Sequence, residues 1–171
     1  MGAAARPGGL RACGARRIGL GGLGVRGAAL SVLLDTHVWL CWLTGQASLP
    51  DRERTSLDLV AARQELCLSA ISLWEAQMLH AKRRIELPLP FPEWLRRAAA
   101  PSVVRVLPLD AEVVIALDTL PARFHGDPAD RIIVATARVH RLSLATHDER
   151  IRRSRAVRTW RAPSRRRQHA T

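Results

Sequence analysis

From Val32 onward, short apolar runs alternate along the chain with longer segments in which apolar residues recur every three or four positions. Short apolar runs are typical of buried strands, and the wider spacing is typical of amphipathic helices. Alternation of the two predicts the α/β class, with a central, mostly parallel sheet flanked by helices. The pattern predicts strands over 31–35, 66–70, 103–109, 142–146 and 157–160, helices over 36–45, 48–64, 72–84, 93–100, 110–120 and 127–141, and a helical turn over 147–154.

Charge is distributed unevenly along this chain. The formal net charge is +12, but residues 35–149 hold all 15 acids against 13 basic residues and are net −2. The basic excess lies in the ends, with five arginines in residues 1–34 and nine in residues 150–171. Such ends can attract a polyanion such as RNA, or they can be arginine-rich composition without a ligand. If they attract RNA, binding at low salt should depend on the arginines between Arg150 and Arg167.

The ends also set the expected domain limits. A folded domain is expected over residues 32–160 and a basic, disordered tail over residues 161–171. Residues 1–31 are expected to be a disordered extension. Their arginine-rich, acid-free composition is that of a mitochondrial transit peptide; alternatively, translation begins near Ser31 or Val32. We favour the second interpretation, because the first predicted element starts there.

The cysteines and the hydropathy bear on the compartment. Cys13, Cys41 and Cys67 are far apart in sequence, so they indicate neither a disulfide framework nor a zinc knuckle. No apolar stretch approaches the ~20 residues that cross a membrane. These features predict a cytoplasmic protein without a membrane segment.

Four acids occupy similar places relative to the predicted elements. Asp35 ends the first strand, and Asp148 follows the strand over 142–146. Glu75 and Asp130 fall in the predicted first turns of two helices. In an open parallel sheet, ligands bind outside the carboxyl ends of the strands, where such strand ends and helix starts gather. The four carboxylates are therefore expected to converge at one edge of the sheet.

Each acid also has a purely structural interpretation. Ser72 and Glu75 match a capping box, and Asp35 and Asp148 can each cap the helix that follows. Asp127 and the proline after it match the start of a helix, whose dipole Asp130 would then complement. For any single acid this alternative is the better one, whereas the coincidence of four at one predicted edge favours a site.

Convergence of the acids would determine the chemistry. Several neighbouring carboxylates repel one another and are neutralised either by raised pKa values or by a cation. Oxygen ligands select Mg²⁺, with Mn²⁺ as a substitute, rather than zinc. A metal held in this way can activate water and neutralise a phosphate, so metal-assisted phosphodiester hydrolysis is the expected reaction.

Other residue types carry weaker signals. His37, His125 and His147 stand near the acids without a regular metal-ligand spacing, and surface positions are expected for them. The tryptophans near the acids are expected in the core or at a dimer interface rather than as stacking platforms for bases; they are Trp39, Trp42 and Trp74.

Two other functions are each compatible with part of this sequence. An aspartate-nucleophile phosphatase needs a second aspartate two residues after Asp35, where His37 stands, and a lysine near the phosphate, for which Lys82 is poorly placed. A non-catalytic RNA-binding or regulatory domain could use the basic ends alone. The complete set of acids argues against this second reading.

Four segments together resemble a known family: "LLDTHVWLCWL", "LSAISLWEAQML", "DPADRIIVATA" and "LATHDERI". They are similar to the PIN-domain family, and in particular to the VapC-type ribonuclease toxins of bacterial toxin–antitoxin pairs. The likeness runs from about Val32 to Trp160 and implies a three-layer fold. It also implies that Asp35, Glu75, Asp130 and Asp148 form a catalytic, Mg²⁺-binding cluster, with Thr146 and Asp127 in support.

The resemblance further implies the activity and partners. It predicts an endoribonuclease that hydrolyses RNA phosphodiester bonds, a homodimer, and a small antitoxin protein that inhibits the nuclease. Residues before Ser31 and after Trp160 lie outside the resemblance and gain no role from it.

Overall fold

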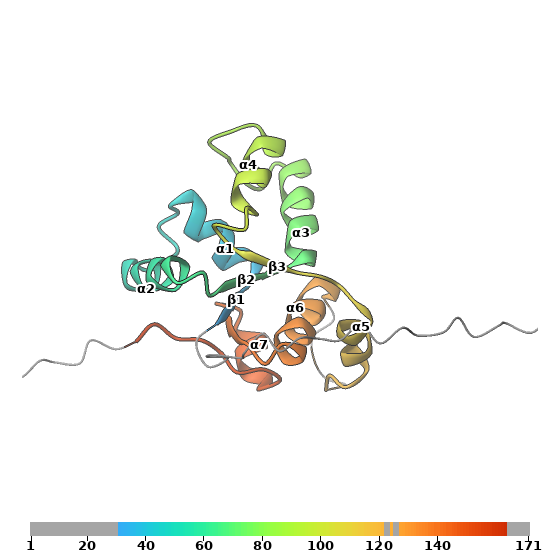
Figure 1. The fold of residues 1–171 in the computed structure, drawn as a ribbon. Helices are drawn as coiled ribbons and strands as arrows, with labels where there is room; N and C mark the ends of the chain where they lie inside the picture. The colour runs from blue at the N-terminus through green and yellow to red at the C-terminus, as the bar shows by residue number, and fades with distance from the viewer. Residues whose placement is uncertain (1–30, 122–123, 125–126, 164–171) are drawn as a thin grey trace, which may run out of the picture.

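Four parallel strands form the centre of the computed structural model, which describes residues 31–121, 124 and 127–163 (Figure 1). The strands are β1 (Val32–Leu34), β2 (Leu66–Ser69), β3 (Arg105–Leu107) and β4 (Ser143–Ala145), in the order β3-β2-β1-β4. In register, Leu33 of β1 lies opposite Cys67 of β2 and Leu144 of β4. The helices of the described residues are α1 (Thr36–Thr44), α2 (Asp51–Ala62), α3 (Ala70–Ala81), α4 (Phe91–Ala98), α5 (Ala111–Asp118), α6 (Pro128–Val139) and α7 (Glu149–Ser154).

Helices cover both faces of the sheet because its central strands, β1 and β2, are buried on both faces. Val32 and Leu34 pack into a core with Trp39 of α1, Leu57 of α2 and Trp94 of α4. Leu33 points the other way and packs into a second core, which contains Ile133 of α6 and Ile151 of α7. Strands buried on both faces are typical of parallel sheets. The predicted α/β fold with helices on both sides of a parallel sheet is confirmed, and its three layers are visible in Figure 1.

Local sequence signals explain where the helices nearest the acids begin and end. Helix α1 ends at Gly45, whose φ of 72° is left-handed and suits a residue without a Cβ. Helix α6 begins with Pro128 at its first position, after Asp127, whose side chain accepts a hydrogen bond from the backbone N–H of Ala129. These ends place Asp35 and Asp130 at the starts of α1 and α6.

The strand predicted over 157–160 is wrong, since that segment forms only an isolated bridge between Leu144 and Thr159. The Leu144 N–H donates to the carbonyl of Arg158, and the Trp160 N–H donates to the carbonyl of Leu144. Alternate residues of a strand turn their backbone groups to opposite sides. In the three-residue strand β4, Leu144 is the residue that faces this segment, so no ladder develops.

The predictions for the ends of the chain lie largely outside the described residues, because residues 1–30 and 164–171 are not described. The expectation of a disordered or wrongly assigned extension therefore stays a prediction. None of the helices that the structure describes has the length and apolar character required to cross a membrane.

Candidate active site

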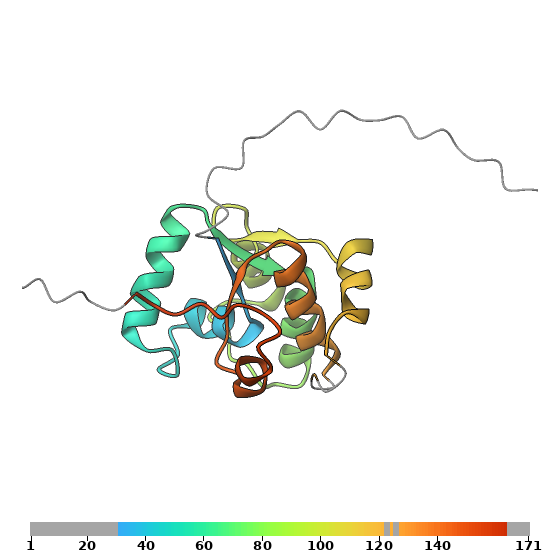
Figure 2. The same cartoon turned by 90° about the horizontal axis from the view of Figure 1, so that it is seen from below.

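The four predicted acids line one cleft at the carboxyl edge of the sheet. Figure 2 shows α1, α7 and the N-terminal end of α6 gathered at the same end of the strands. The cleft has a volume of about 540 Å³ and is lined by Asp35, Thr36, His37, Cys41, Ser48, Glu75, Asp127, Asp130, His147 and Asp148. The structure thus brings together side chains separated by more than a hundred positions in sequence.

Asp35 is buried at the base of this cleft, directly after β1. It stands at the position that precedes α1, but its side chain forms no well-aligned capping hydrogen bond, and its interaction with the His37 backbone N–H is secondary to its bond with Thr146. Its carboxylate instead accepts a hydrogen bond from Thr146 Oγ1, 2.5 Å away across β1 and β4. Burial raises the pKa of Asp35, and the Asp148 carboxylate adds to the rise, while the Thr146 bond opposes it.

Glu75 reaches the cleft from α3. The helix begins at Ala70, so Glu75 lies in its second turn rather than the first, and Ser72 does not cap it. The predicted capping box is therefore wrong. The Thr36 hydroxyl donates a hydrogen bond to Glu75 Oε2 at 2.5 Å and lies 2.8 Å from Ser72 Oγ.

The surroundings of Glu75 favour its neutral form. Burial raises the pKa of Glu75 to about 7, and the hydrogen bond from Thr36 opposes this rise. Repulsion from the carboxylates of Asp35, Asp130 and Asp127 contributes to this rise. A group that loses or gains a proton near neutral pH thus faces the other acids of the cleft.

The remaining acids, Asp127, Asp130 and Asp148, do have the roles at helix starts that their sequence positions allowed. Asp148 Oδ1 accepts hydrogen bonds from the N–H groups of Arg150 and Ile151, which begin α7. Asp127 Oδ1 caps α6 in the same way. Asp130 lies in the first turn of α6, where its charge suits the helix dipole. A role at the start of a helix does not exclude a role in the site, because Asp127, Asp130 and Asp148 all line the cleft as well.

Sequence reasoning missed Thr36 and the pairing of His147. Thr36 is buried directly after Asp35, and a hydroxyl at the end of a buried strand was a usable signal. His147 Nε2 lies 2.6 Å from Glu53 Oε2, a contact between residues 94 positions apart that no local pattern indicates. His37 is exposed, as expected, whereas His125 lies outside the described residues.

The donor set of the cleft fits a hard divalent cation by its chemistry. Asp35, Glu75, Asp130 and Asp148 offer carboxylate oxygens. Burial first, and repulsion from neighbouring carboxylates second, raise the pKa values of Asp35 and Glu75, and a cation would offset both effects. Within the described part of the chain, however, no three histidine, cysteine or acidic side chains stand close enough to hold an ion as they lie. The carboxylates would have to come closer together for joint coordination.

Together, the sheet and its acidic cleft define an α/β protein with a carboxylate site at the strand ends. The sequence model of the family described as PIN domain matches residues 32–156. The chain therefore belongs to the PIN-domain family, and the resemblance read from the four segments is confirmed. Membership in this family removes the aspartate-nucleophile phosphatase from consideration.

Relatives and solved structures agree with this assignment. The chain is 37% identical over 123 residues to Ribonuclease VapC22 of Mycobacterium tuberculosis, a match that covers 71% of this chain and 90% of that protein. Its fold is similar to that of VapBC2 from Rickettsia felis bound to a promoter DNA fragment, with a TM-score of 0.58, 15% identity, and 75% and 96% of the two chains covered. FitAcB from Neisseria gonorrhoeae gives a TM-score of 0.58 at 21% identity, covering 77% and 97%. At these identities the solved structures support the fold alone.

Proposed function

We propose that this chain is a Mg²⁺-dependent endoribonuclease that hydrolyses RNA phosphodiester bonds and acts as the toxin of a toxin–antitoxin pair. The observation that carries the proposal is the cleft in which Asp35, Glu75, Asp130 and Asp148 meet. The 37% identity to a protein named Ribonuclease VapC22 supports RNA as the substrate. The free thiols of Cys41 and Cys67 suit a reducing cytoplasm.

Each side chain of the cleft has a role in this proposal. Asp35, Glu75, Asp130 and Asp148 hold the metal, for which Mn²⁺ is a substitute. Bound there, the metal supplies positive charge that acidifies water and neutralises the phosphate. Thr146 orients Asp35, and Thr36 orients Glu75, through the hydrogen bonds that their hydroxyls donate. With a pKa near 7, Glu75 can release a proton when the cleft gains positive charge.

The partners are proposed from the same relationship. Two of the solved structures with this fold are described as VapBC complexes bound to DNA, which supports a small antitoxin as a partner of this chain. We also propose a homodimer. Trp39 is buried in the core, whereas Trp74 on α3 is 54% exposed and available for such a contact.

Purified protein incubated with a mixed pool of RNA should cleave it with Mg²⁺ and leave it intact with EDTA. Mapping of the cut sites should show internal cuts that recur at defined positions. Cleavage that persists in EDTA would contradict the metal requirement. Binding of RNA without cleavage in saturating Mg²⁺ or Mn²⁺ would favour the non-catalytic RNA-binding domain instead.

The hydroxyl of Thr146 should influence the pH dependence of that cleavage. Thr146→Val removes the hydrogen bond that opposes the effect of burial, so the pKa of Asp35 should rise further. More of the Asp35 carboxyl is then protonated at a given pH, and the acidic limb of the pH–rate profile should move to higher pH. Thr146→Ser keeps the hydroxyl and should restore the original profile. Superimposable profiles for the valine variant and the wild type would contradict the proposal that Thr146 orients Asp35.

A further inference from the structure

A second hollow, of about 520 Å³, lies beside the acidic cleft on the side of α2 and α7. It is lined by Pro50, Arg52, Glu53, Arg152, Arg161 and Ala162, which we call the arginine groove. Its guanidinium groups come from the start of α2, from α7 and from the C-terminal segment. The groove is therefore a basic surface that three separate parts of the chain build together.

Backbone carbonyls hold two of these arginines in place. The Nε of Arg52 donates to the carbonyl of Pro163 at 3.1 Å, and its Nη2 donates to the carbonyls of Ala162 and Pro163. These bonds fix the C-terminal segment along the start of α2, as Figures 1 and 2 show. Arg152 donates from Nε to the carbonyl of Thr146 at 2.9 Å. The carbonyl acceptors are neutral, so these bonds do not compensate the positive charge of Arg52.

The acids near the groove are in contact with basic side chains. Glu53 lies 2.6 Å from His147 Nε2. Glu149 lies 3.3 Å from Arg152 and 3.7 Å from Arg153, on the exposed side of α7. The groove itself contains three arginines, Arg52, Arg152 and Arg161, against these two acids. Its net charge therefore remains positive.

The arginine groove and the acidic cleft share a wall. Glu53 lines the groove and His147 lines the cleft, and these two side chains contact each other. Arg152 is bonded to the carbonyl of Thr146, whose side chain holds Asp35. The groove is therefore the neighbouring hollow on this side of the cleft.

We propose that the arginine groove binds the phosphates of single-stranded RNA next to the bond that is cut, on one side of it. This inference rests on the proposed nuclease function and extends it. Carboxylates repel a polyanion, so the cleft needs positive charge beside it to retain the strand. An acidic protein segment has the same charge, but the groove adjoins the acidic cleft through the contact of Glu53 with His147, which favours RNA.

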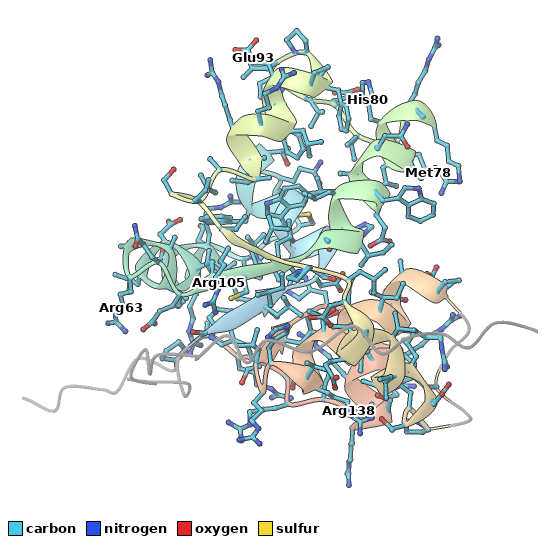
Figure 3. All side chains as sticks on the ribbon, turned by 45° about the vertical axis from the view of Figure 1, so that its right-hand side comes forward. Arg63, Met78, His80, Glu93, Arg105 and Arg138 are labelled. Carbon is cyan, nitrogen blue, oxygen red and sulfur yellow. The ribbon has the colours of Figure 1, made fainter. Side chains whose placement is uncertain are left out.

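The test compares two double variants of the full-length chain. Arg52→Gln/Arg161→Gln removes two charges from the groove. The control Arg63→Gln/Arg138→Gln removes two charges from exposed positions, one directly after α2 and one on α6, and Figure 3 shows both residues on the outer surface, away from each other. The pairs are matched, since Arg138, like Arg52, donates to a backbone carbonyl. Arg152 is left intact, because it supports Thr146.

Binding of a fluorescent single-stranded RNA is measured in EDTA at several salt concentrations. Each phosphate contact contributes about 0.7 to the slope of log affinity against log salt, so the groove variant should lose about 1.4 of that slope. The control should keep the wild-type slope. Arg52→Lys/Arg161→Lys retains the charge and should recover most of the slope, which separates loss of charge from misfolding.

RNAs extended on either side of the mapped cut site give a second readout. Extension of the RNA toward the groove should tighten binding by the wild type but not by the groove variant. Any increase in affinity from extension on the other side should be the same for both proteins. Equal slopes for the groove variant and the wild type would overturn the proposal, as would equal losses in both double variants. Unchanged RNA binding with lost binding of poly-L-glutamate would assign the groove to an acidic protein segment instead. Because the salt slope is measured without cleavage, its failure is distinct from a failure of Mg²⁺-dependent hydrolysis.

Discussion

Asp35→Asn and Asp130→Asn should each lower the rate of RNA cleavage by about three orders of magnitude in saturating Mg²⁺. Removal of one carboxylate charge weakens a site that holds a dication, and ~4 kcal/mol of lost transition-state stabilisation corresponds to this factor. In EDTA, the melting temperature of each variant should equal or exceed that of the wild type, since repulsion in the cleft is relieved. Initial rates and thermal unfolding curves measure the two effects.

Asp110→Asn provides the matched control, because Asp110 caps α5 by accepting a hydrogen bond from the Val113 N–H. The variant should lose no more than about 1 kcal/mol of stability and keep its activity. If Asp130 were only a helix-start residue, its asparagine variant would behave like that of Asp110. Cleavage at a near wild-type rate by Asp130→Asn would therefore assign it a capping role alone.

The metal-free protein should lose stability as the pH rises from about 4.5 to about 7, and then level off. The pKa of Glu75 is about 7 in the folded protein against 4.5 for an ordinary glutamate, mainly because of burial. Between these values the unfolded chain has released the proton and the folded chain still holds it. Stability falls with pH wherever the unfolded state binds fewer protons. At ~1.4 kcal/mol for each pKa unit the full shift corresponds to about 3.5 kcal/mol. Glu75 is only partly buried, and screening by solvent reduces the expected fall to roughly 2–3 kcal/mol.

Glu75→Gln should remove this part of the pH dependence and make the metal-free protein more stable than the wild type above pH ~7. Glu86→Gln changes an exposed acid outside the cleft and should leave the curve unchanged. Urea unfolding in EDTA across the pH range gives the free energies. Parallel curves for the wild type and Glu75→Gln would show that Glu75 keeps an ordinary pKa in the folded protein.

Local patterns were sufficient to predict most of the sheet and the meeting of the acids. Strands such as Val32–Leu34 are apolar on both faces, and this property is visible in consecutive residues. Once the sheet is parallel, residues at strand ends and helix starts must gather at its carboxyl edge. Asp35, Asp130 and Asp148 were placed correctly for this reason. Gly45 and Pro128 marked helix ends because their backbone preferences are intrinsic to the residue.

The same local reasoning failed where a residue's role depends on distant partners. Asp35 and Asp148 occupy the same position before a helix, yet Asp148 caps its helix and Asp35 bonds to Thr146 instead. The segment over 157–160 has the composition of a strand, but the short strand β4 offers it one pairing residue. In both cases the hydrogen bonds that form depend on which residue lies opposite in the folded structure.

The sequence by itself determined the α/β class, the order of the elements and the edge of the sheet at which the acids lie, because these follow from the periodicity of neighbouring residues. Only the tertiary structure decided how the acids behave. The pKa of Glu75 depends on burial and on carboxylates contributed by β1 and α6, and the arginine groove depends on contacts such as that of Arg52 with Pro163, 111 positions away. Electrostatic interactions depend on distance in space and on exclusion of water, and neither is encoded in the spacing of residues along a chain.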